Sequence, residues 1–222
     1  MKISILVGHG KGTLGGYDPG ACANGSQEFQ IAKEIARYAE EHLRTMYDCS
    51  TELINYNADK SLNQRIALYK KKGSTNFLAE IHLNSYKNTT AKGTEVWYYK
   101  GDATGKSYAE NIERKLVSAL GTTSRGAKAA TSQFGIIKKT APTAVLVETC
   151  FISSPTDLNK VSTATGRKTA GIAIAEGIAM AAGLSKKKVV LPDVLKVSGF
   201  KTIQEIETLA AKLKAEGYTC TR

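Results

Sequence analysis

The stretch NFLAEIHLN, residues 76–84, decides the fold class of this 222-residue chain. It is a short apolar run that ends in polar residues, which is typical of a strand buried on both faces of a parallel sheet. On either side of this run, further apolar runs alternate with segments of helical periodicity. Strands are expected at ISILV (3–7), STELINY (50–56), GTEVWYY (93–99), FGII (134–137) and AVLV (144–147), and helices at 27–46, 61–73, 107–120 and about 165–182. This order predicts an α/β fold, with a twisted, mostly parallel sheet of about six strands and helices on both faces.

Composition indicates a soluble globular protein, with 42% hydrophobic and 23% charged residues. No segment approaches the roughly 18 uninterrupted apolar residues that a membrane span requires. The apolar start MKISILV is too short for a secretory signal and runs directly into VGHG. We therefore expect no membrane insertion, no signal peptide and synthesis in a cytoplasm. Cys22, Cys49, Cys150 and Cys220 form no CxxC pair and are expected to be free thiols.

The formal net charge of +11 favours anionic partners such as nucleic acid, acidic lipid or the anionic polymers of a cell wall. The basic residues are mostly dispersed, and no aromatic-rich RNA-binding pattern accompanies them. Nucleic acid is therefore disfavoured as a partner.

The chain divides into a main domain over 1–184, a linker SKKK at 185–188 and a small segment over 189–222. The last segment has the pattern of a strand, a helix and a second strand, a β-α-β appendage. About 34 residues rarely build a stable core alone. It is expected to pair with a partner copy or to pack against the main domain.

Three polar residues, His9, His82 and Glu148, each end an apolar run. The carboxyl ends of parallel strands line the crevice where α/β proteins bind ligands. Together with Glu28, in the first turn of the helix after a glycine-rich loop, they offer two imidazoles and two carboxylates. His9, Glu28 and His82 could supply the three ligands of a catalytic zinc ion, and Glu148 could carry protons.

Each of these residues also has a structural interpretation. A histidine at a strand end is often hydrogen-bonded at the surface, and Glu28 could complement the positive end of the helix dipole. Glu148 is harder to explain in this way, because a carboxylate after AVLV loses hydration unless a partner receives it. Glu80 shares a strand face with His82 and could orient it. Cys150 could be a nucleophile or a fourth ligand, but core packing is favoured, and His42 is expected to be a surface or packing residue.

Eight pieces of the chain occur in the order of a known family: VGHG (7–10), NGSQEFQIAKEIA (24–36), LNQRIALYKK (62–71), FLAEIHLNS (77–85), KGTEVWYY (92–99), SRGAKAA (124–130), FGIIKKTAPTAVLVETCFISSPTD (134–157) and GRKTAGIAIAEGI (166–178). From Lys2 to about Leu184 the chain resembles the zinc-dependent N-acetylmuramoyl-L-alanine amidases of the amidase type 3 family. The KGTEVWYY version looks most like the amidase modules of phage endolysins that attack Gram-positive walls.

The resemblance implies a zinc ion held by His9, Glu28 and His82, with Glu148 as general base and acid. The bond cut would be the amide between N-acetylmuramic acid and the L-alanine of the peptidoglycan stem peptide. Asn84, Arg125 and Lys128 match family positions around the substrate groove, and Glu80 is expected behind a ligand. Arg65 also matches a family position, but it is expected to be a structural ion-pair partner. The long loop before Glu28 leaves Glu34 as an alternative ligand, with Glu28 preferred because it lies at the helix mouth.

The segment VLKVSGFKTIQEIETLAAKLKAEGYTCTR, residues 194–222, is similar to half of the sporulation-related peptidoglycan-binding repeat. Two copies from two chains could complete one repeat, which would give a homodimer with a composite wall-binding surface. These resemblances imply an endolysin made in the host cytoplasm that reaches peptidoglycan after release. The alternatives are a bacterial autolysin of the same chemistry, a non-catalytic wall-binding protein and a nucleic-acid-binding protein.

Overall fold

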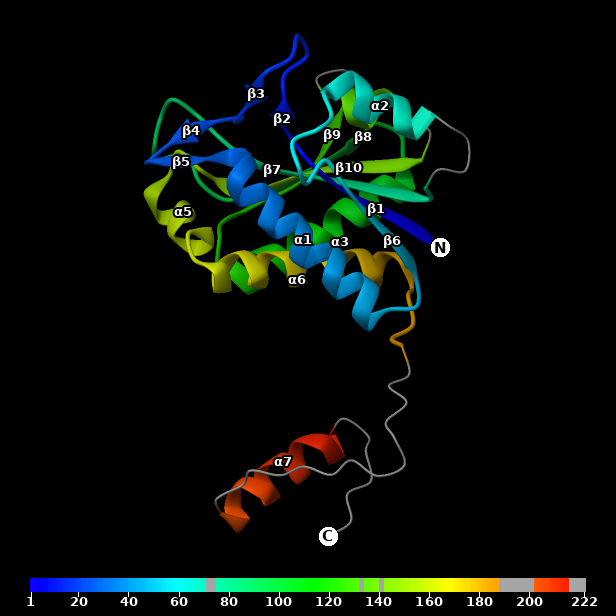
Figure 1. The fold of residues 1–222 in the computed structure, drawn as a ribbon, viewed down its shortest axis with the longest axis vertical. Helices are drawn as coiled ribbons and strands as arrows, with labels where there is room; N and C mark the ends of the chain where they lie inside the picture. Colours follow the sequence, from blue (N-terminus) through cyan, green and yellow to red (C-terminus); the bar gives the residue numbers. More distant parts are fainter. Residues whose placement is uncertain (71–74, 132–133, 140–141, 188–201, 216–222) are drawn as a thin grey trace. The chain divides into compact units, whose positions relative to one another are not determined.

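The computed structural model describes residues 1–70, 75–131, 134–139, 142–187 and 202–215. Contacts divide the chain into two units, Met1–Lys187 and Lys188–Arg222. The first unit is built on a six-stranded sheet with the order β6-β1-β7-β10-β8-β9 (Figure 1). Its strands are β1 (Lys2–Val7), β6 (Ser50–Ile54), β7 (Phe77–Asn84), β8 (Thr94–Tyr99), β9 (Ser124–Ala130) and β10 (Thr143–Phe151).

The direction of the strands confirms a mostly parallel sheet. β6, β1, β7 and β10 run parallel to one another, β8 is antiparallel to β10, and β9 is parallel to β8. Helices α1 (Glu28–Met46), α2 (Leu62–Lys70) and α3 (Ala103–Leu120) make the crossovers from β1 to β6, from β6 to β7 and from β8 to β9. The carboxyl ends of β1, β7 and β10 therefore meet at one edge of the sheet, where the site lies.

One strand prediction was wrong. Residues 134–137 were expected to form a strand, but Phe134 precedes the short helix α4 (Gly135–Lys139) and the other three residues begin it, and β9 is the sixth strand. An apolar run of four residues fits a buried helix turn as well as a strand, and Ile136 and Ile137 are buried as part of α4. β9 lacks the β-branched residues of a typical strand because it is an edge strand that is largely open to solvent.

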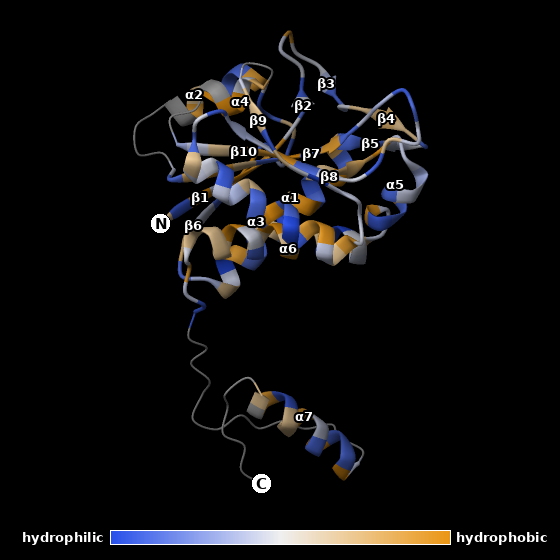
Figure 2. Ribbon diagram, turned by 180° about the vertical axis from the view of Figure 1, so that it is seen from behind, coloured by the Kyte–Doolittle hydropathy of each residue, from blue (hydrophilic) through white to orange (hydrophobic). Residues whose placement is uncertain are grey.

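Helices cover both faces of the sheet, as predicted. α1 and α3 pack on one face, and α6 (Ala164–Ala182) packs against both of them. The short helices α2 and α4 cover the other face. Figure 2 shows the apolar residues gathered where the strands and the long helices meet. Each face carries its own core cluster, with Ile5, Phe77 and Val147 in one and Leu6, Leu78 and Leu146 in the other.

Two glycines let α6 approach its neighbours closely. A Cβ on Gly171 would lie 2.6 Å from Cβ of Tyr38 in α1, and a Cβ on Gly177 would lie 2.6 Å from Cα of Ile112 in α3. Both distances are far below an ordinary carbon–carbon contact. α6 therefore depends on hydrogen at these two positions to contact both helices.

A bulge interrupts β10 beside the site. Glu148 pairs with His82 of β7, but Phe151 pairs with Asn84, so β10 contains one extra residue between the two pairs. Before the bulge, Val145 and Val147 face the core under α1 and α3; after it, Cys150 and Ile152 do. In a regular strand Cys150 would share the face of Glu148. The bulge instead turns its thiol into the core, where burial raises the pKa of that thiol.

The remaining elements are short. The loop between β1 and α1 holds two ribbons, β2 (Gly10–Lys11) with β3 (Tyr17–Asp18) and β4 (Cys22–Ala23) with β5 (Ser26–Gln27), and α5 (Pro155–Val161) precedes α6. Ser185 and Lys187 make main-chain hydrogen bonds of 2.9 Å with Asp48 and Met46. Cys22, Cys49 and Cys150 are free thiols, and Cys220 lies outside the described residues.

In the second unit the structure describes α7 (Ile203–Ala215). Thr202 and Glu205 exchange hydrogen bonds of 3.3 Å at its start, a capping box. The two strands predicted for this appendage fall outside the described residues. Among those residues, no helix is both long enough and apolar enough to cross a membrane.

Candidate active site

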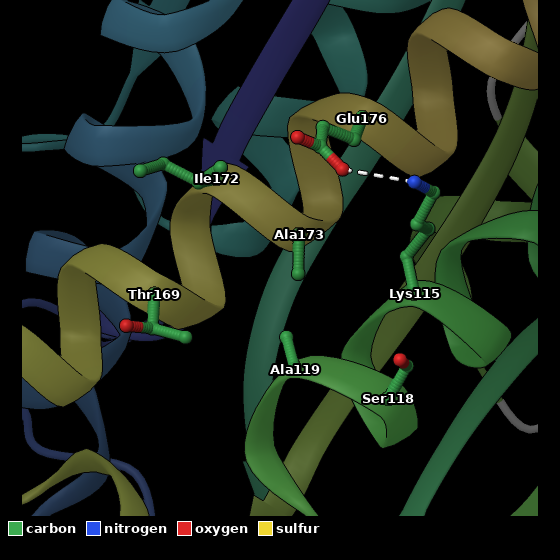
Figure 3. A pocket seen from close by; sticks show the side chains of 7 residues that line it. All are labelled: Lys115, Ser118, Ala119, Thr169, Ile172, Ala173 and Glu176. Carbon is green, nitrogen blue, oxygen red and sulfur yellow. Dashed lines mark hydrogen bonds and ion pairs between the residues drawn. The ribbon is translucent and has the colours of Figure 1, made fainter. Parts of the chain in front are cut away.

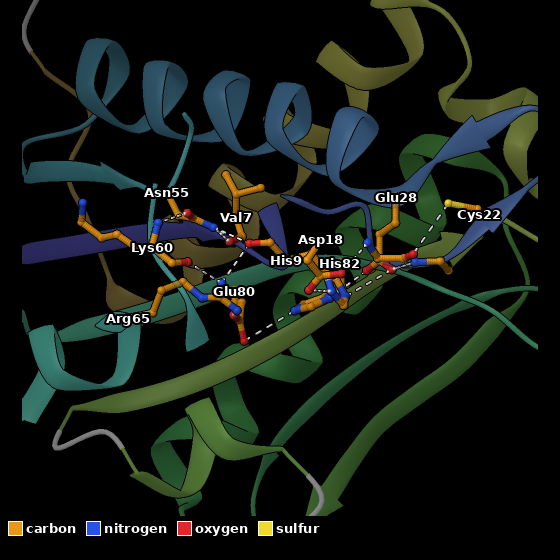
Figure 4. Close-up of polar contacts among 12 residues, drawn as sticks. Val7, His9, Asp18, Cys22, Glu28, Asn55, Lys60, Arg65, Glu80 and His82 are labelled. Carbon is orange, nitrogen blue, oxygen red and sulfur yellow. Dashed lines mark hydrogen bonds and ion pairs between the residues drawn. The ribbon is translucent and has the colours of Figure 1, made fainter. Parts of the chain in front are cut away.

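His9, Glu28 and His82 lie together at the carboxyl edge of the sheet (Figure 4). His9 follows β1, Glu28 is the first residue of α1, and His82 lies within β7, which continues two residues beyond it. Each offers one ligand atom, and these three atoms lie within 4.8 Å of one another. The group could therefore hold a metal ion.

The main chain at His9 has an unusual conformation, with φ of 60°. Two side chains bind its carbonyl oxygen: Asn55 Nδ2 donates at 2.7 Å and Arg65 Nη1 at 2.9 Å. On the ring, Nδ1 contacts Asp18 Oδ2 at 3.0 Å, and Nε2 faces Glu28 Oε2 at 3.3 Å. Asp18 and the two donors to the carbonyl thus aim Nε2 of His9 into the cluster.

His82 is held between two carboxylates. Its Nδ1 contacts Glu28 Oε1 at 2.8 Å, and its Nε2 lies 3.5 Å from Glu80 Oε2. Arg65 Nη2 lies 3.3 Å from the other oxygen of Glu80. Only glycine fits beside this ring, because a Cβ on Gly8 would lie 2.2 Å from His82 Cε1. Arg65 is therefore the structural ion-pair partner expected from the sequence, and it also links the surroundings of both histidines.

Glu28 does not cap its own helix through its side chain. Its Oε2 accepts a hydrogen bond from Ala21 N at 2.8 Å, and its Oε1 accepts one from Leu83 N at 3.1 Å. Burial acts to raise the pKa of this carboxyl, but hydrogen bonds with His82 and His9 outweigh it and hold the pKa well below its usual range. Glu28 is therefore an anion fixed by main-chain donors.

The charge balance of the cluster suits a cation. Burial opposes protonation of His82, yet the adjacent carboxylates of Glu28 and Glu80 raise its pKa well above the ordinary value. The same two anions would stabilise a divalent metal ion at this point. Two imidazoles and one carboxylate are a common ligand set of catalytic zinc sites, which keep a fourth position open. The residues present thus fit zinc.

Glu148 lies beside the cluster. It pairs with His82 in β7 and with Glu95 in β8, so all three side chains share one face of the sheet. Its Oε2 is enclosed and has no hydrogen-bond partner among the described residues. Burial, with the negative charges of Glu28 and Glu95, raises the pKa of this carboxyl to about 7. A carboxyl that titrates near neutrality can both accept and return a proton.

A cleft of about 260 Å³ opens in front of the cluster. Its lining includes His9, Lys11, Thr13, Asp18, Leu62, Arg65, Glu80, His82, Phe134, Gly135, Ile136 and Leu146. A hollow of similar size, about 280 Å³, lies between α3 and α6, where Lys115 and Glu176 form an ion pair of 2.9 Å (Figure 3). Besides this ion pair, that hollow is lined by Ser118, Ala119, Thr169, Ile172 and Ala173. These lining residues offer one carboxylate and neither histidine nor cysteine, so the cleft at the strand ends is the candidate active site.

A second polar cluster surrounds Glu95, a residue that the sequence analysis did not single out. Asn84 and Trp97 donate to its Oε1 at 2.9 Å and 3.1 Å. Arg125 and Lys128 each donate to its Oε2 at 2.6 Å. Three residues predicted near the substrate groove are thus gathered by one carboxylate. Strand alternation in TEVWYY, which places Glu95 and Trp97 on one face, could have indicated Glu95, whereas nothing in the glycine-rich loop indicated Asp18.

Two other polar residues do not join the site. Glu34, the alternative ligand, contacts Arg37 and Tyr56 on the outer side of α1. His42 packs against the ring of Tyr47 at 6.0 Å between ring centres.

The family model described as N-acetylmuramoyl-L-alanine amidase, Amidase_3, matches residues 3–180. The chain belongs to this amidase family. It is 30% identical over 221 residues to the N-acetylmuramoyl-L-alanine amidase CwlM of Bacillus licheniformis, with 98% of this chain and 83% of CwlM covered. The family and its relatives establish this amidase as an enzyme that hydrolyses N-acetylmuramoyl-L-alanine amides.

Solved structures share the fold of this amidase. The N-acetylmuramoyl-L-alanine amidase from Clostridium difficile 630 superposes with a TM-score of 0.73 at 24% identity, over 82% of this chain and 96% of that one. The catalytic domain of the CD27L endolysin, which targets Clostridia difficile, superposes with a TM-score of 0.66 at 29% identity, over 80% and 96%.

Proposed function

We propose that this amidase cleaves peptidoglycan at the amide between the lactyl group of N-acetylmuramic acid and L-alanine, with a zinc ion held by His9, Glu28 and His82. The observation that carries the proposal is the group of three converging ligand atoms beside the enclosed carboxyl of Glu148. When bound, zinc supplies Lewis acidity toward the scissile carbonyl and the attacking water.

The protein side chains divide the remaining work. Glu148 takes a proton from the attacking water as the water oxygen bonds to the carbonyl carbon. Glu148 then gives the proton to the alanine nitrogen as the carbon–nitrogen bond breaks, which leaves a lactyl carboxylate and a free amine. Asp18 and Glu80 hold the rings of His9 and His82, because each contacts a ring nitrogen. Arg65 keeps Glu80 in place.

Digestion of purified peptidoglycan tests this function. We expect new free alanine amino termini without new reducing sugar, and we expect a chelator to abolish the release of these termini. Glu148→Gln keeps the shape of the side chain but cannot accept the proton, so it should lower the rate by at least about a hundredfold. Glu110→Gln, on the exposed face of α3, is the matched control. New reducing sugar, or full activity of Glu148→Gln, would contradict the proposal.

For the biological role we propose a phage endolysin that lyses Gram-positive walls. The similarity to the CD27L catalytic domain supports it. A bacterial wall amidase of the autolysin type is the second candidate, because CwlM aligns along nearly the whole chain, including the second unit. Deletion of the gene from the genome that carries it distinguishes the endolysin from the autolysin. An endolysin is required for release of phage progeny, whereas an autolysin alters wall turnover without phage.

We propose that the second unit binds peptidoglycan and pairs with its counterpart in another copy, and that the positive charge adds affinity for anionic wall polymers. The exposed side chains of Ile203 and Ile206 on α7 support an unfilled contact surface. Light scattering across micromolar concentrations should give the mass of a dimer. A constant monomer mass would refute the pairing. Sedimentation of the protein with cell walls, before and after removal of their anionic polymers, tests the charge contribution, and equal binding to both would refute it.

A further inference from the structure

We propose that Arg125, Lys128 and Asn84, gathered around Glu95, form a subsite for a carboxylate of the stem peptide. The inference rests on the proposed function, because it concerns the peptide whose amide Glu148 would cleave. It assigns a specificity to this site, namely a preference for a free carboxylate next to the L-alanine.

Glu95 is an organising residue rather than a reacting one. Its side chain is 5% exposed, and its two oxygens accept four hydrogen bonds, which fills the acceptor capacity of a carboxylate. The donors come from three strands: Asn84 from β7, Trp97 from β8, and Arg125 and Lys128 from β9. Four side chains from distant parts of the chain are thereby held on one face of the sheet.

The two cations keep capacity for a second anion. Of the five N–H donors of Arg125, the one on Nε binds Glu95 and one on Nη1 lies 3.5 Å from the carbonyl oxygen of Lys92. Lys128 uses one of its three ammonium protons on Glu95, and the two side chains are 35% and 31% exposed. Both side chains are held in place by aromatic rings. Arg125 lies over the ring of Phe151 at 5.0 Å, and Lys128 lies over the ring of Trp97 at 5.3 Å. Gly93 makes room for Arg125, because a Cβ there would lie 2.9 Å from its Cγ.

Charge and position point to a carboxylate of the substrate. Two cations share one buried carboxylate, so the cluster carries a net positive charge that a second carboxylate would neutralise. Because Glu95 pairs directly with Glu148, the cluster begins about 5 Å from the residue beside the scissile amide. One or two residues of extended peptide, at roughly 3.3–3.6 Å each, span the reach of the two long side chains. The residue after L-alanine therefore falls at the cluster.

A matched pair of substrates tests the subsite. Both are N-acetylmuramoyl-L-alanyl peptides, and they differ only in whether the residue after alanine carries a free carboxylate or a carboxamide. Because charge-assisted hydrogen bonds are roughly twice as strong as neutral ones, we expect kcat/KM to be about tenfold higher for the carboxylate form. The ratio between the two substrates does not depend on the fraction of folded enzyme.

Variants assign the preference to residues. Arg125→Gln and Lys128→Gln should each reduce the ratio toward one, and Arg125→Lys should retain part of it. Lys100→Gln, an exposed lysine just beyond the far end of β8, should leave the ratio unchanged. Equal kcat/KM for the two substrates, or a ratio unaffected by both glutamine variants, would overturn the subsite while leaving the amidase function intact. Cleavage of neither substrate, together with no alanine amino termini from whole peptidoglycan, would overturn the function and the subsite with it.

Discussion

Glu148 combines two demands that conflict within a single side chain. The proposed mechanism requires it to carry a proton, yet one of its oxygens is enclosed without a hydrogen-bond partner among the described residues. A carboxylate in such a position favours its protonated form, which is why its pKa rises to about 7. The ionised form needed to accept a proton therefore costs folding free energy.

This conflict predicts how stability depends on pH. Between the unfolded pKa near 4.5 and the folded pKa of about 7, the folded protein binds more protons at Glu148, so this residue lowers stability as pH rises. Glu148→Gln removes the effect. In chelator, the variant should be more stable than the wild type by roughly 3 kcal/mol at pH 8, and the difference should fall below about 0.5 kcal/mol near pH 4.5. Urea unfolding at both pH values measures it, and an equal difference at both would contradict the assignment.

Asp18 allows a test of how the ligand ring is held. It contacts Nδ1 of His9 at 3.0 Å from a partly exposed loop, so substitution should alter the ring more than the fold. Asp18→Ala should weaken zinc binding by about 10–100-fold. Competition with a chromogenic chelator gives the affinity. Asp48→Ala, an exposed aspartate after α1, is the control and should bind zinc as the wild type does.

Among the helices and strands, the sequence predicts those with a clear hydrophobic period and misses features that depend on contacts with neighbouring elements. The strands and helices with clear periodicity, such as β7 and α1, lie where the sequence places them. α4 was predicted as a strand because four apolar residues are too few to define a period. β9 was missed because a half-exposed edge strand lacks an apolar face. The bulge in β10 depends on its pairing with β7 and leaves no mark in the sequence.

The close approach of α6 to α3 depends on the absence of a side chain at Gly177. A methyl group on Gly177 would meet Cα and N of Ile112 at 2.6 Å and 2.9 Å, and main-chain atoms cannot move aside as a flexible side chain can. Gly177→Ala should therefore destabilise the fold by about 1–3 kcal/mol, although alanine favours helices. Thermal unfolding measures the change. Lys168→Ala, at an exposed position of the same helix, should change stability by less than about 0.5 kcal/mol.

At the scale of the whole chain, the site is assembled from segments far apart in sequence, from His9 to Glu148. Strand ends made His9, His82 and Glu148 visible in the sequence, and the family resemblance added the roles. The sequence could not indicate Asp18, Asn55 or the acceptor role of Glu95, because each depends on a contact between segments that only the folded chain brings together.

Such an assembly couples metal binding to folding. A zinc ion bound by His9, Glu28 and His82, as we propose, would stabilise the folded state by about 2.7 kcal/mol at a zinc concentration of 100 times the dissociation constant. For a chain of this size we expect the melting temperature of the first unit to rise by roughly 5–10 °C. Scanning calorimetry with and without zinc measures the shift. His82→Ala should lose it, and a shift retained in that variant would place the metal elsewhere.

The extra residue in β10 also keeps the thiol of Cys150 away from the cleft that contains Glu148. Cys150 stands two positions after Glu148, close enough in sequence to capture a metal ion or to be oxidised in the cleft, yet its thiol is sealed in the core. Cys22, by contrast, is exposed near the metal-type cluster. A peroxide or an alkylating reagent should therefore modify Cys22 and spare Cys150, so that the thiol two positions after Glu148 stays reduced while the exposed thiol reacts.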